Sequence, residues 1–391
     1  MPKSDVVAAL VPEITAIRRD FHRHPELMYE VHRTAGIVAE KLKEWGVDEV
    51  VTGIGQTGVV GVIRGKGQAS GKVIGMRADM DALPIHEQTN LEHRSTVPGK
   101  MHACGHDGHT AMLLGAAKYL TQTRDFDGTA VLIFQPAEEG GAGAKAMIDD
   151  GLITRFGIQE VYGMHNKPGV PVGRFEIAKG PAMAAADRIH IKIEGLGGHA
   201  AAPHRVNDPI VACCALVSAL QTVASRNADP LDSIVVSVTA LNAGEAFNVI
   251  PQTAEIKGSI RTLTPETRAL AQKRITAIVA GVMAAFDMKY DLEYHLGYPV
   301  TFNHAGQTDF VTSVAKEAFG SNAIKTDIPP TMGSEDFSFM LEERPGAFIN
   351  IGNGDSAGLH HPAYEFNDEA IPVGVKYWAS LIEISMPQRA A

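Results

Sequence analysis

The sequence predicts an α/β protein in which a doubly wound sheet domain is interrupted by a smaller domain of ferredoxin-like order, βαββαβ. Two observations lead to this prediction. Toward both ends of the chain, short apolar runs bounded by Gly, Asp or Pro alternate with helical patterns, as in a parallel sheet covered by helices. In the middle, two strand patterns follow each other between two helical patterns. A chain of 391 residues has room for two or three domains.

The first predicted elements are helices. Apolar residues recur with helical spacing from Val6 to Ile17 and again from about His32 to Trp45, where Gly46 ends the pattern. The period then changes to short apolar runs, which we expect to be strands at 58–65, 72–80, 128–136, 160–166 and 346–354. Helical patterns alternate with these runs at 108–122, 142–150, 308–319 and 370–385. Such alternation is typical of a doubly wound sheet.

The middle of the chain has its own order of elements. It reads as strand, helix, strand, strand, helix and strand, at 186–194, 206–226, 233–242, 252–262, 265–286 and 289–298. We therefore expect an inserted lid or dimerisation domain at 182–297. The larger domain is then made of residues 1–181 and 298–391.

Composition restricts the class of partner. Lys and Arg number 35 against 45 Asp and Glu, a net charge of −10, which argues against nucleic acid and anionic membranes as partners. The longest apolar runs, Ile210 to Leu220 and Ala277 to Phe286, are shorter than a membrane span. No signal-like apolar segment follows Met1, so we expect a cytoplasmic protein.

The chain has three cysteines. Cys213 and Cys214 lie in an apolar helical pattern, whereas Cys104 lies outside it, in the segment MHACGHDGHT.

Chemically active side chains follow several predicted strands. In an open α/β sheet the site forms where the strands end, so we examined the residues after each strand. Five segments supply Cys, His or carboxylate groups there: Asp79 with Asp81, Cys104 with His106, Glu138 with Glu139, His165, and His360 with His361. Each group alone is more easily explained as a structural residue. Together they are metal ligands in unusual density, and without CxxC pairs they favour an open catalytic site over a structural zinc site.

The adjacent pair Glu138 and Glu139 suggests a division of labour. One carboxylate can ligate a metal while its neighbour takes a proton from the attacking water and passes it to a leaving amine. The sequence therefore predicts metal-assisted hydrolysis of an acyl bond.

At this point a family resemblance emerges. The sequence resembles the amidohydrolase branch of the aminoacylase and carboxypeptidase metallopeptidases, which holds hippurate hydrolases, N-acyl-L-amino-acid amidohydrolases and indole-3-acetyl-amino-acid hydrolases. The resemblance runs from about residue 13 to 380. It is carried by RADMDALPI (77–85), HACGHDGHT (102–110), FQPAEEGGAGA (134–144), GMHN (163–166), GGHAAAPH (197–204), AFNVIP (246–251), MGSEDF (332–337) and LHHPAYEFND (359–368).

The resemblance implies a site with two divalent metal ions, for which manganese, zinc and cobalt remain open. Glu138 is implied as general base and acid, and the implied ligands are Cys104, His106, Glu139, His165 and His360. More distant relatives carry a ligand His on the strand at 77–81, where this chain has Asp79 and Asp81. We interpret those two aspartates as groups that orient ligands. His102 and His109 match the motif but receive no ligand role.

The inserted domain supplies further candidates. His199 follows two glycines and resembles a histidine that reaches the neighbouring subunit's site and stabilises the tetrahedral oxyanion. It could also be a surface residue of a turn without a chemical role. Asn248 is implied as a substrate-binding residue near that oxyanion. Arg261 could grip a substrate carboxylate or could pair with a surface carboxylate. Ser334 reads as the N-cap of a helix, and Glu335 and Asp336 suggest no chemical role.

These observations predict a homodimer, or a dimer-based homo-oligomer, that hydrolyses N-acyl-L-amino acids of the hippurate type to a carboxylic acid and an amino acid. A dipeptidase or carboxypeptidase on the same scaffold is the nearest alternative. A non-catalytic binding protein stabilised by the metal cluster is the second, although Glu138 is a carboxylate that a structural site does not require.

Overall fold

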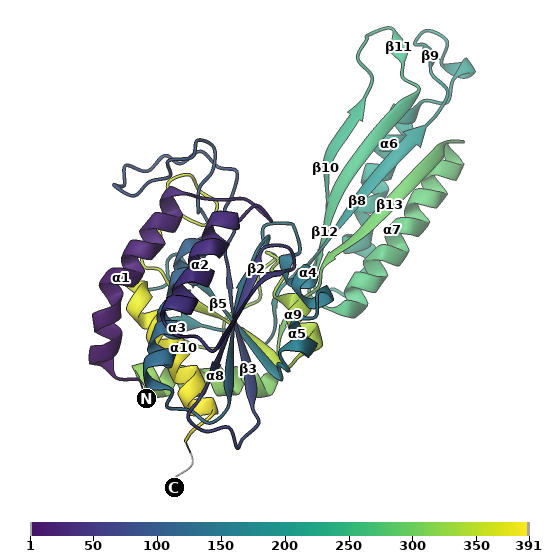
Figure 1. The fold of residues 1–391 in the computed structure, drawn as a ribbon. Coiled ribbons are helices and arrows are strands. Elements are labelled where there is room, and N and C mark those ends of the chain that lie inside the picture. Colours follow the sequence, from purple (N-terminus) through teal and green to yellow (C-terminus); the bar gives the residue numbers. More distant parts are fainter. Residues whose placement is uncertain (1, 389–391) are drawn as a thin grey trace. The chain divides into compact units, whose positions relative to one another are not determined.

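The computed structural model describes residues 2–388, which form two compact units. The first unit comprises residues up to Ala182, Phe302–Pro329 and those from Asp336 onward. The second comprises Met183–Thr301 and Pro330–Glu335, so a short late segment returns to it. The chain is a mixed α/β protein, as the sequence predicts, and each unit has its own sheet and hydrophobic core (Figure 1).

The first unit is built on an eight-stranded sheet of order β1-β2-β4-β3-β5-β16-β6-β15. Its central strands β4, β3, β5 and β16 are parallel, whereas β1 and β2 are antiparallel additions at one edge. The edge strand β1 was not predicted because it is short and half-exposed, and β6 and β15 were missed because each has only two residues. The strands are β1 (Glu49–Ile54), β2 (Gly58–Arg64), β3 (Val73–Asp79), β4 (Thr129–Gln135), β5 (Glu160–Lys167), β6 (Phe175–Glu176), β15 (Ile324–Lys325) and β16 (Gly346–Gly352).

Helices lie on both faces of this sheet (Figure 1). One layer contains α1 (Ser4–Arg23), α2 (His32–Glu44), α3 (His106–Thr123), α8 (Ala305–Phe319) and α10 (Ala370–Ser385). The other contains α4 (Gly143–Asp149), α5 (Leu152–Arg155) and α9 (Ser338–Glu343). Helix α9 begins after Phe337, so the prediction that Ser334 caps a helix is wrong. The short strands β7 (Gly180–Met183) and β14 (Thr301–Asn303) pair with each other.

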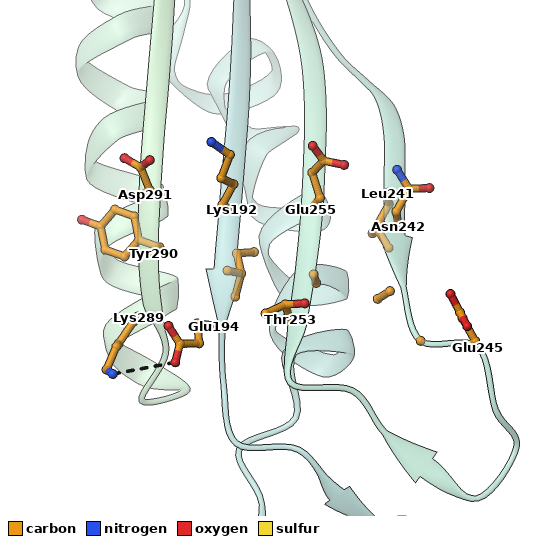
Figure 2. A pocket seen from close by; sticks show the side chains of 14 residues that line it. Lys192, Glu194, Leu241, Asn242, Glu245, Thr253, Glu255, Lys289, Tyr290 and Asp291 are labelled. Atoms are coloured by element: carbon orange, nitrogen blue, oxygen red, sulfur yellow. Dashed lines mark ion pairs between the residues drawn. The ribbon is translucent and has the colours of Figure 1, made fainter.

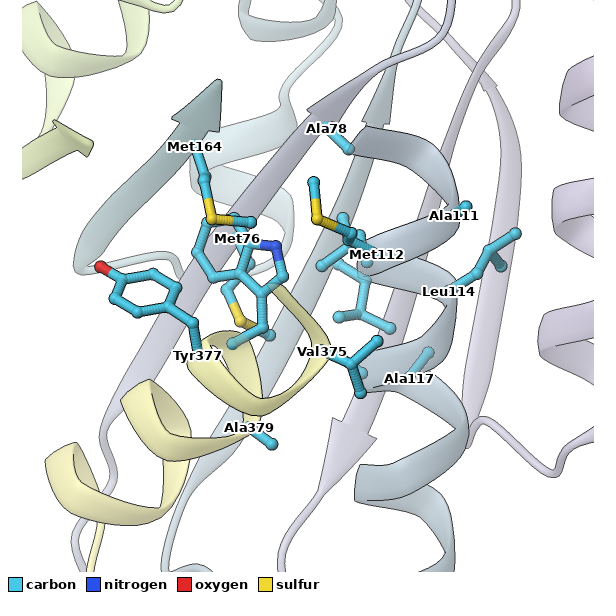
Figure 3. Packing of buried hydrophobic residues seen from close by; sticks show 14 of the residues in the cluster. Met76, Ala78, Ala111, Met112, Leu114, Ala117, Met164, Val375, Tyr377 and Ala379 are labelled. Atoms are coloured by element: carbon cyan, nitrogen blue, oxygen red, sulfur yellow. The ribbon is translucent and has the colours of Figure 1, made fainter. Parts of the chain in front are cut away.

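Alternation along β3 assigns its side chains to the two faces of the sheet. Met76 and Ala78 belong to the hydrophobic cluster with Met112 of α3 and Tyr377 of α10 (Figure 3). Helices α3 and α10 approach closely there: a Cβ added at Gly374 would lie 2.1 Å from the Met112 sulfur. The residues between, including the buried Arg77, lie on the opposite face. The strand therefore delivers apolar side chains to one layer and polar side chains to the other.

The second unit has the order predicted for the inserted segment. Its antiparallel sheet runs β10-β12-β8-β13, and one face packs on α6 and α7 through Ile189, Ile191, Leu216 and Ile275. The elements are β8 (Ala185–Glu194), β9 (Gly198–His199), a 3-10 turn (Pro203–Arg205), α6 (Pro209–Leu220), a π-helical turn (Val223–Asn227), β10 (Ile234–Ala243), β11 (Val249–Ile250), β12 (Thr253–Thr262), α7 (Pro265–Ala285) and β13 (Lys289–Tyr298).

The open face of this sheet is charged. Figure 2 shows a hollow on it, where Lys192, Glu255 and Asp291 come from neighbouring strands and Lys289 pairs with Glu194 at 3.8 Å. Alternate residues of the strands thus face either the apolar core or solvent, as expected for an antiparallel sheet covered on one side.

The helix predicted at 206–226 overlaps a segment with the length and apolar character of a membrane span. Pro209–Asn227 has 19 residues and a mean hydropathy of 1.4, which is long and apolar enough to cross a membrane by length and composition. The statement that no apolar run reaches that length is therefore wrong, because the helical pattern continues past Leu220. A third of the segment is buried, and Ala212, Cys213 and Leu216 pack in the core of the second unit.

Candidate metal centre

The carboxyl ends of three strands and the start of one helix meet at one place in the first unit. Asp79 ends β3, Glu138 and Glu139 follow β4, and His165 lies near the end of β5. His106 begins α3, and Cys104 lies two residues before it. His360 comes from the loop after β16. Parallel strands end at the same edge of a sheet, which explains why residues far apart in sequence meet.

Ligand atoms of these side chains lie close together. Cys104 Sγ is 3.4 Å from His165 Nε2, and His360 Nε2 is 3.3 Å from Glu139 Oε1. His106 Nε2 lies 3.9 Å from the same Glu139 oxygen. Within 4.8 Å of one another lie the groups Cys104, His106 and His165; Cys104, Glu139 and His360; and His106, Glu138 and Glu139. The structure therefore brings the five predicted ligands and Glu138 into one cluster.

The donor atoms fit divalent cations. Both ring nitrogens of His106 and Oε1 of Glu139 are buried and make no hydrogen bond of good geometry among the described residues, although oppositely charged groups lie 3.3–3.9 Å away. Unsatisfied buried polar atoms are costly unless something else binds them. Thiolate, imidazole and carboxylate together are ligands that zinc and similar cations take in proteins.

Burial and charge act on these groups in opposite directions. Burial raises the pKa of the Cys104 thiol and lowers that of His165 well below its usual value. Burial alone would also lower the pKa of His106, but the charges of Asp79 and Cys104 raise it well above its usual value. Since ligands must be deprotonated to bind a metal, cation binding would release protons from this cluster.

Asp81 holds the two glutamates in place. Its Oδ1 accepts the backbone N–H of Glu138 at 3.0 Å, and its Oδ2 accepts that of Glu139 at 3.1 Å. The turn before them requires a left-handed backbone at Ala137, with φ 54°. Asp81 therefore fixes the turn from which both glutamate side chains extend. This is the contact expected of a residue that orients metal ligands.

A second support runs behind the cluster through Arg77. This buried guanidinium donates to Asp79 Oδ2 at 2.8 Å, to Gln135 Oε1 at 2.8 Å and to Asp336 Oδ1 at 2.9 Å. Asp336 also accepts the backbone N–H of Ala144, at the start of α4. Asp336, for which the sequence suggested no role, therefore joins β3, β4 and α4.

A buried cluster of charges lies on the α1 side of the same loop. His22 Nδ1 is 2.8 Å from Asp107 Oδ2, which Arg18 also contacts at 3.3 Å. Burial alone would lower the pKa of His22, but Asp107 raises it to about 9. Burial lowers the pKa of His102 to about 3 and, together with Arg18, that of His93 to about 4. Asp107 directly follows the proposed ligand His106. The contacts of Asp107 with His22 and Arg18 therefore hold the segment that carries His106.

The remaining candidates lie in the second unit. His199 is exposed, its Nδ1 accepts the N–H of Ala201 at 3.0 Å, and β9 pairs with β11 beside Asn248. Arg261 donates to Ser334 Oγ at 2.9 Å and makes no ion pair among the residues described. The stretch of β12 from Thr253 to Arg261 spans about 27 Å at the usual strand rise. The structure thus groups His199 with Asn248 and leaves Arg261 at the far end of the sheet.

The supporting residues Arg77, Asp107 and Asp336 were not found from the sequence. Nor were Asn166, which donates to the Cys104 carbonyl oxygen, and Tyr364, which donates to Asn166. One signal was available for Arg77, because a charged residue inside a buried strand requires partners. For the others the decisive contacts are long-range, and no local pattern reveals them.

A model of peptidase family M20/M25/M40 matches residues 75–384. The hippurate hydrolase of Campylobacter jejuni is 46% identical over 379 residues, covering 95% of this chain and 98% of that protein. The N-acetyl-L-cysteine deacetylase of Bacillus subtilis is 42% identical, covering 93% and 86%. A Bacillus subtilis dinuclear metal-binding peptidase of the M20 family superposes with a TM-score of 0.84 at 35% identity, covering 97% and 99%.

Proposed function

The chain belongs to peptidase family M20/M25/M40 and is an amidohydrolase, and from that premise we propose that it cleaves the amide bond of N-acyl-L-amino acids. Hippurate-like compounds are the proposed substrates, and a carboxylic acid and a free amino acid are the products. The observation that carries this proposal is Glu138 beside Glu139 in a cluster of metal-ligand atoms. Two relatives whose names specify N-acyl amino acids support it.

We propose that two divalent cations, zinc, manganese or cobalt, are held by Cys104, His106, Glu139, His165 and His360. Bound there, they would polarise the scissile carbonyl and lower the pKa of the attacking water. The dinuclear peptidase with the same fold supports the number of ions.

Glu138 serves as the proton carrier in this proposal. Its carboxylate is buried beside the ligand atoms, and its backbone is fixed by Asp81. It accepts a proton from the attacking water and later donates it to the nitrogen of the leaving amino acid. Glu139 faces His360 and His106 as a ligand would, and the family resemblance assigns the proton-carrying role to Glu138.

His199, Asn248 and Arg261 are proposed to act on the same substrate: His199 and Asn248 at the oxyanion, and Arg261 at the carboxylate. Within one second unit, Arg261 lies about 27 Å or more from the hairpin of His199, further than a hippurate molecule extends. If both contact one substrate, they must come from different copies of the chain. This separation supports a site that is completed by the partner subunit.

Surface features of the second unit support a homodimer. Strand β10 is an edge of its sheet, with backbone groups free to pair with another chain. Exposed apolar side chains lie nearby: Leu241 on β10, Phe247 and Val249 at β11, and Val211 on α6. Such exposure is typical of surfaces buried in an assembly. We propose that this unit is the lid and dimerisation domain, and that the enzyme is cytoplasmic without nucleic-acid or membrane partners.

A substrate panel tests the proposed function. Metal-free protein is reconstituted with zinc, manganese or cobalt and incubated with N-benzoyl, N-acetyl and indole-acetyl amino acids and with dipeptides bearing a free amine. We expect hydrolysis of the acylated amino acids and little of the dipeptides. Preference for dipeptides would indicate the peptidase alternative. No hydrolysis with two ions bound would favour a binding protein.

A further inference from the structure

Asn166 contacts three of the segments that carry proposed metal ligands. It is buried, follows His165 in β5, and uses every polar group that it has. We propose that Asn166 is a positioning residue that sets the mutual placement of Cys104, His165 and His360. This inference rests on the proposed ligand set.

The backbone of Asn166 orients His165. The His165 Nδ1 atom lies 2.7 Å from the carbonyl oxygen of Asn166. A carbonyl can only accept, so Nδ1 carries the proton and Nε2 keeps its lone pair. It is Nε2 that faces Cys104 Sγ at 3.4 Å. Fixing the second nitrogen of a ligand histidine in this way sets both its tautomer and its ring orientation.

The side chain of Asn166 ties two other segments to β5. Its Nδ2 donates to the carbonyl oxygen of Cys104 at 2.6 Å, and its Oδ1 accepts from the Tyr364 hydroxyl at 2.7 Å. Tyr364 lies on the loop of His360, whose own N–H donates to the Ala103 carbonyl at 2.8 Å. One amide group therefore joins the Cys104 loop, β5 and the His360 loop.

His109 holds Asn166 from the other side. Its Nε2 accepts the backbone N–H of Asn166 at 2.9 Å and also lies 3.0 Å from Nδ2. Its Nδ1 donates to Asp79 Oδ1 at 2.6 Å. The chain of bonds thus continues from Asn166 through Asp79 to Arg77.

Close packing leaves no room for an alternative arrangement at this point. A Cβ added at Gly105 would lie 2.3 Å from Asn166 Nδ2 and 2.5 Å from the Tyr364 hydroxyl oxygen, and Gly105 has φ 86°. A glycine between Cys104 and His106 is therefore required for the Asn166 amide to reach the Cys104 carbonyl.

The test compares Asn166→Ala with Asn303→Ala. Asn303 is an equally buried asparagine whose amide bonds the backbone of Ala178 and Phe348 and, among the residues described, makes no hydrogen bond to the Cys104, His165 or His360 segments. Zinc affinity is measured by competition with a chelator, the thiolate-to-cobalt charge-transfer band by absorption, and unfolding on the metal-free chains. We expect both variants to lose stability, but only Asn166→Ala to bind zinc about 10- to 100-fold more weakly and to shift or lose the thiolate band.

Equal zinc affinity and an unchanged cobalt band in the two variants would overturn the proposal. If Asn166→Ala does not fold, Tyr364→Phe tests the proposal in its place, because it removes only the hydroxyl group that donates to Asn166 Oδ1. We expect weaker zinc binding in that variant, and wild-type affinity would contradict positioning through Asn166. A wild-type chain that binds cobalt without a thiolate band would instead refute the ligand set.

Discussion

Glu138 and Glu139 are neighbours in the chain, and a carboxylate oxygen of each lies within 4.8 Å of a ring nitrogen of His106. Glu139 Oε1 faces two histidines of the cluster, at 3.3 Å and 3.9 Å. Asp81 accepts both backbone N–H groups, which fixes the turn that carries the two side chains. The assignment of Glu139 as ligand and Glu138 as proton carrier stays a proposal, which the Glu138→Gln variant tests.

Replacing Glu138 by Gln should abolish proton transfer and leave metal binding intact. An amide cannot accept the proton from water, and general-base catalysis contributes typically 10²- to 10⁴-fold. We expect kcat to fall by about that factor with unchanged metal content, measured by steady-state kinetics and elemental analysis. A near-normal rate would mean that the roles of Glu138 and Glu139 are reversed.

His22 gives a second prediction, in stability against pH. Its folded-state pKa of about 9 lies above the ordinary value of 6.5. The stabilisation is therefore complete below about pH 6.5 and lost as pH rises through 9, and it amounts to roughly 3 kcal/mol. The groups around the imidazole are Asp107, Glu87, Arg18, His93 and His102.

Urea unfolding of the metal-free wild type and His22→Gln measures this effect. The difference in unfolding free energy should be large at pH 6 and small at pH 9.5. A difference that does not change over this interval would show that His22 is not charged in the folded chain.

At the residue scale, the clustering of the six predicted side chains followed from the rule that parallel strands end at one edge. Their roles as ligands and base stay predictions. The supporting residues could not be predicted, because Asn166 acts through contacts to Cys104 and Tyr364, which are distant in sequence. A sequence pattern records which residues are present but not which carbonyl an amide reaches.

At the scale of elements, Arg77 joins β3 to β4 and to the segment before α9. The Arg77 guanidinium faces three buried polar groups: the carboxylates of Asp79 and Asp336 and the amide of Gln135. Burial of such groups is tolerated only while the opposite charge is present. Arg77 therefore contributes to the packing of this face of the sheet, together with His109 at Asp79 and the Ala144 N–H at Asp336.

Arg77→Met should destabilise the first unit by about 3–5 kcal/mol, because it leaves the carboxylates of Asp79 and Asp336 without their cation. Arg64→Met is a control, since Arg64 is an exposed arginine at the end of β2 and should change stability by less than about 0.5 kcal/mol. Denaturant unfolding of both variants tests this. If both variants lose a similarly small amount of unfolding free energy, Arg77 does not support the sheet.

Long apolar or amphipathic segments were predicted with few errors in their bounds. The helices α1, α2, α7 and α10 and the strands β3, β4 and β16 are examples. The edge strand β1 was missed because its pattern, EVVTGI, is short and half-exposed. The predicted helix 206–226 ends in a π-helical turn at Val223–Asn227, which depends on packing rather than on sequence period.

At the scale of the whole molecule, the second unit separates His199 from Arg261 along its sheet. The proposed assembly resolves this separation by supplying the two groups to one substrate from different copies. The fold class could be predicted from element order alone. The sharing of a site between copies is an implication of the family resemblance and stays a prediction, because it depends on how two copies are placed in space.

Complementation tests the shared site. His199→Ala and Glu138→Gln should each be nearly inactive. In a mixed dimer one site combines intact Glu138 with intact His199, and the other carries both defects. Random pairing should therefore restore roughly a quarter of wild-type activity on co-expression, given two-fold symmetry. Inactive chains that demonstrably mix would show that His199 does not serve the partner's site.

The most direct test is a metal titration of the metal-free protein with hippurate as substrate. The hydrolysis rate should rise with added zinc, manganese or cobalt and level off at two equivalents per chain, while Cys104→Ala should bind at least one ion fewer and lose activity. Full activity of the metal-free chain, or two bound ions in Cys104→Ala with a normal rate, would contradict a hydrolase built on the Cys104 cluster.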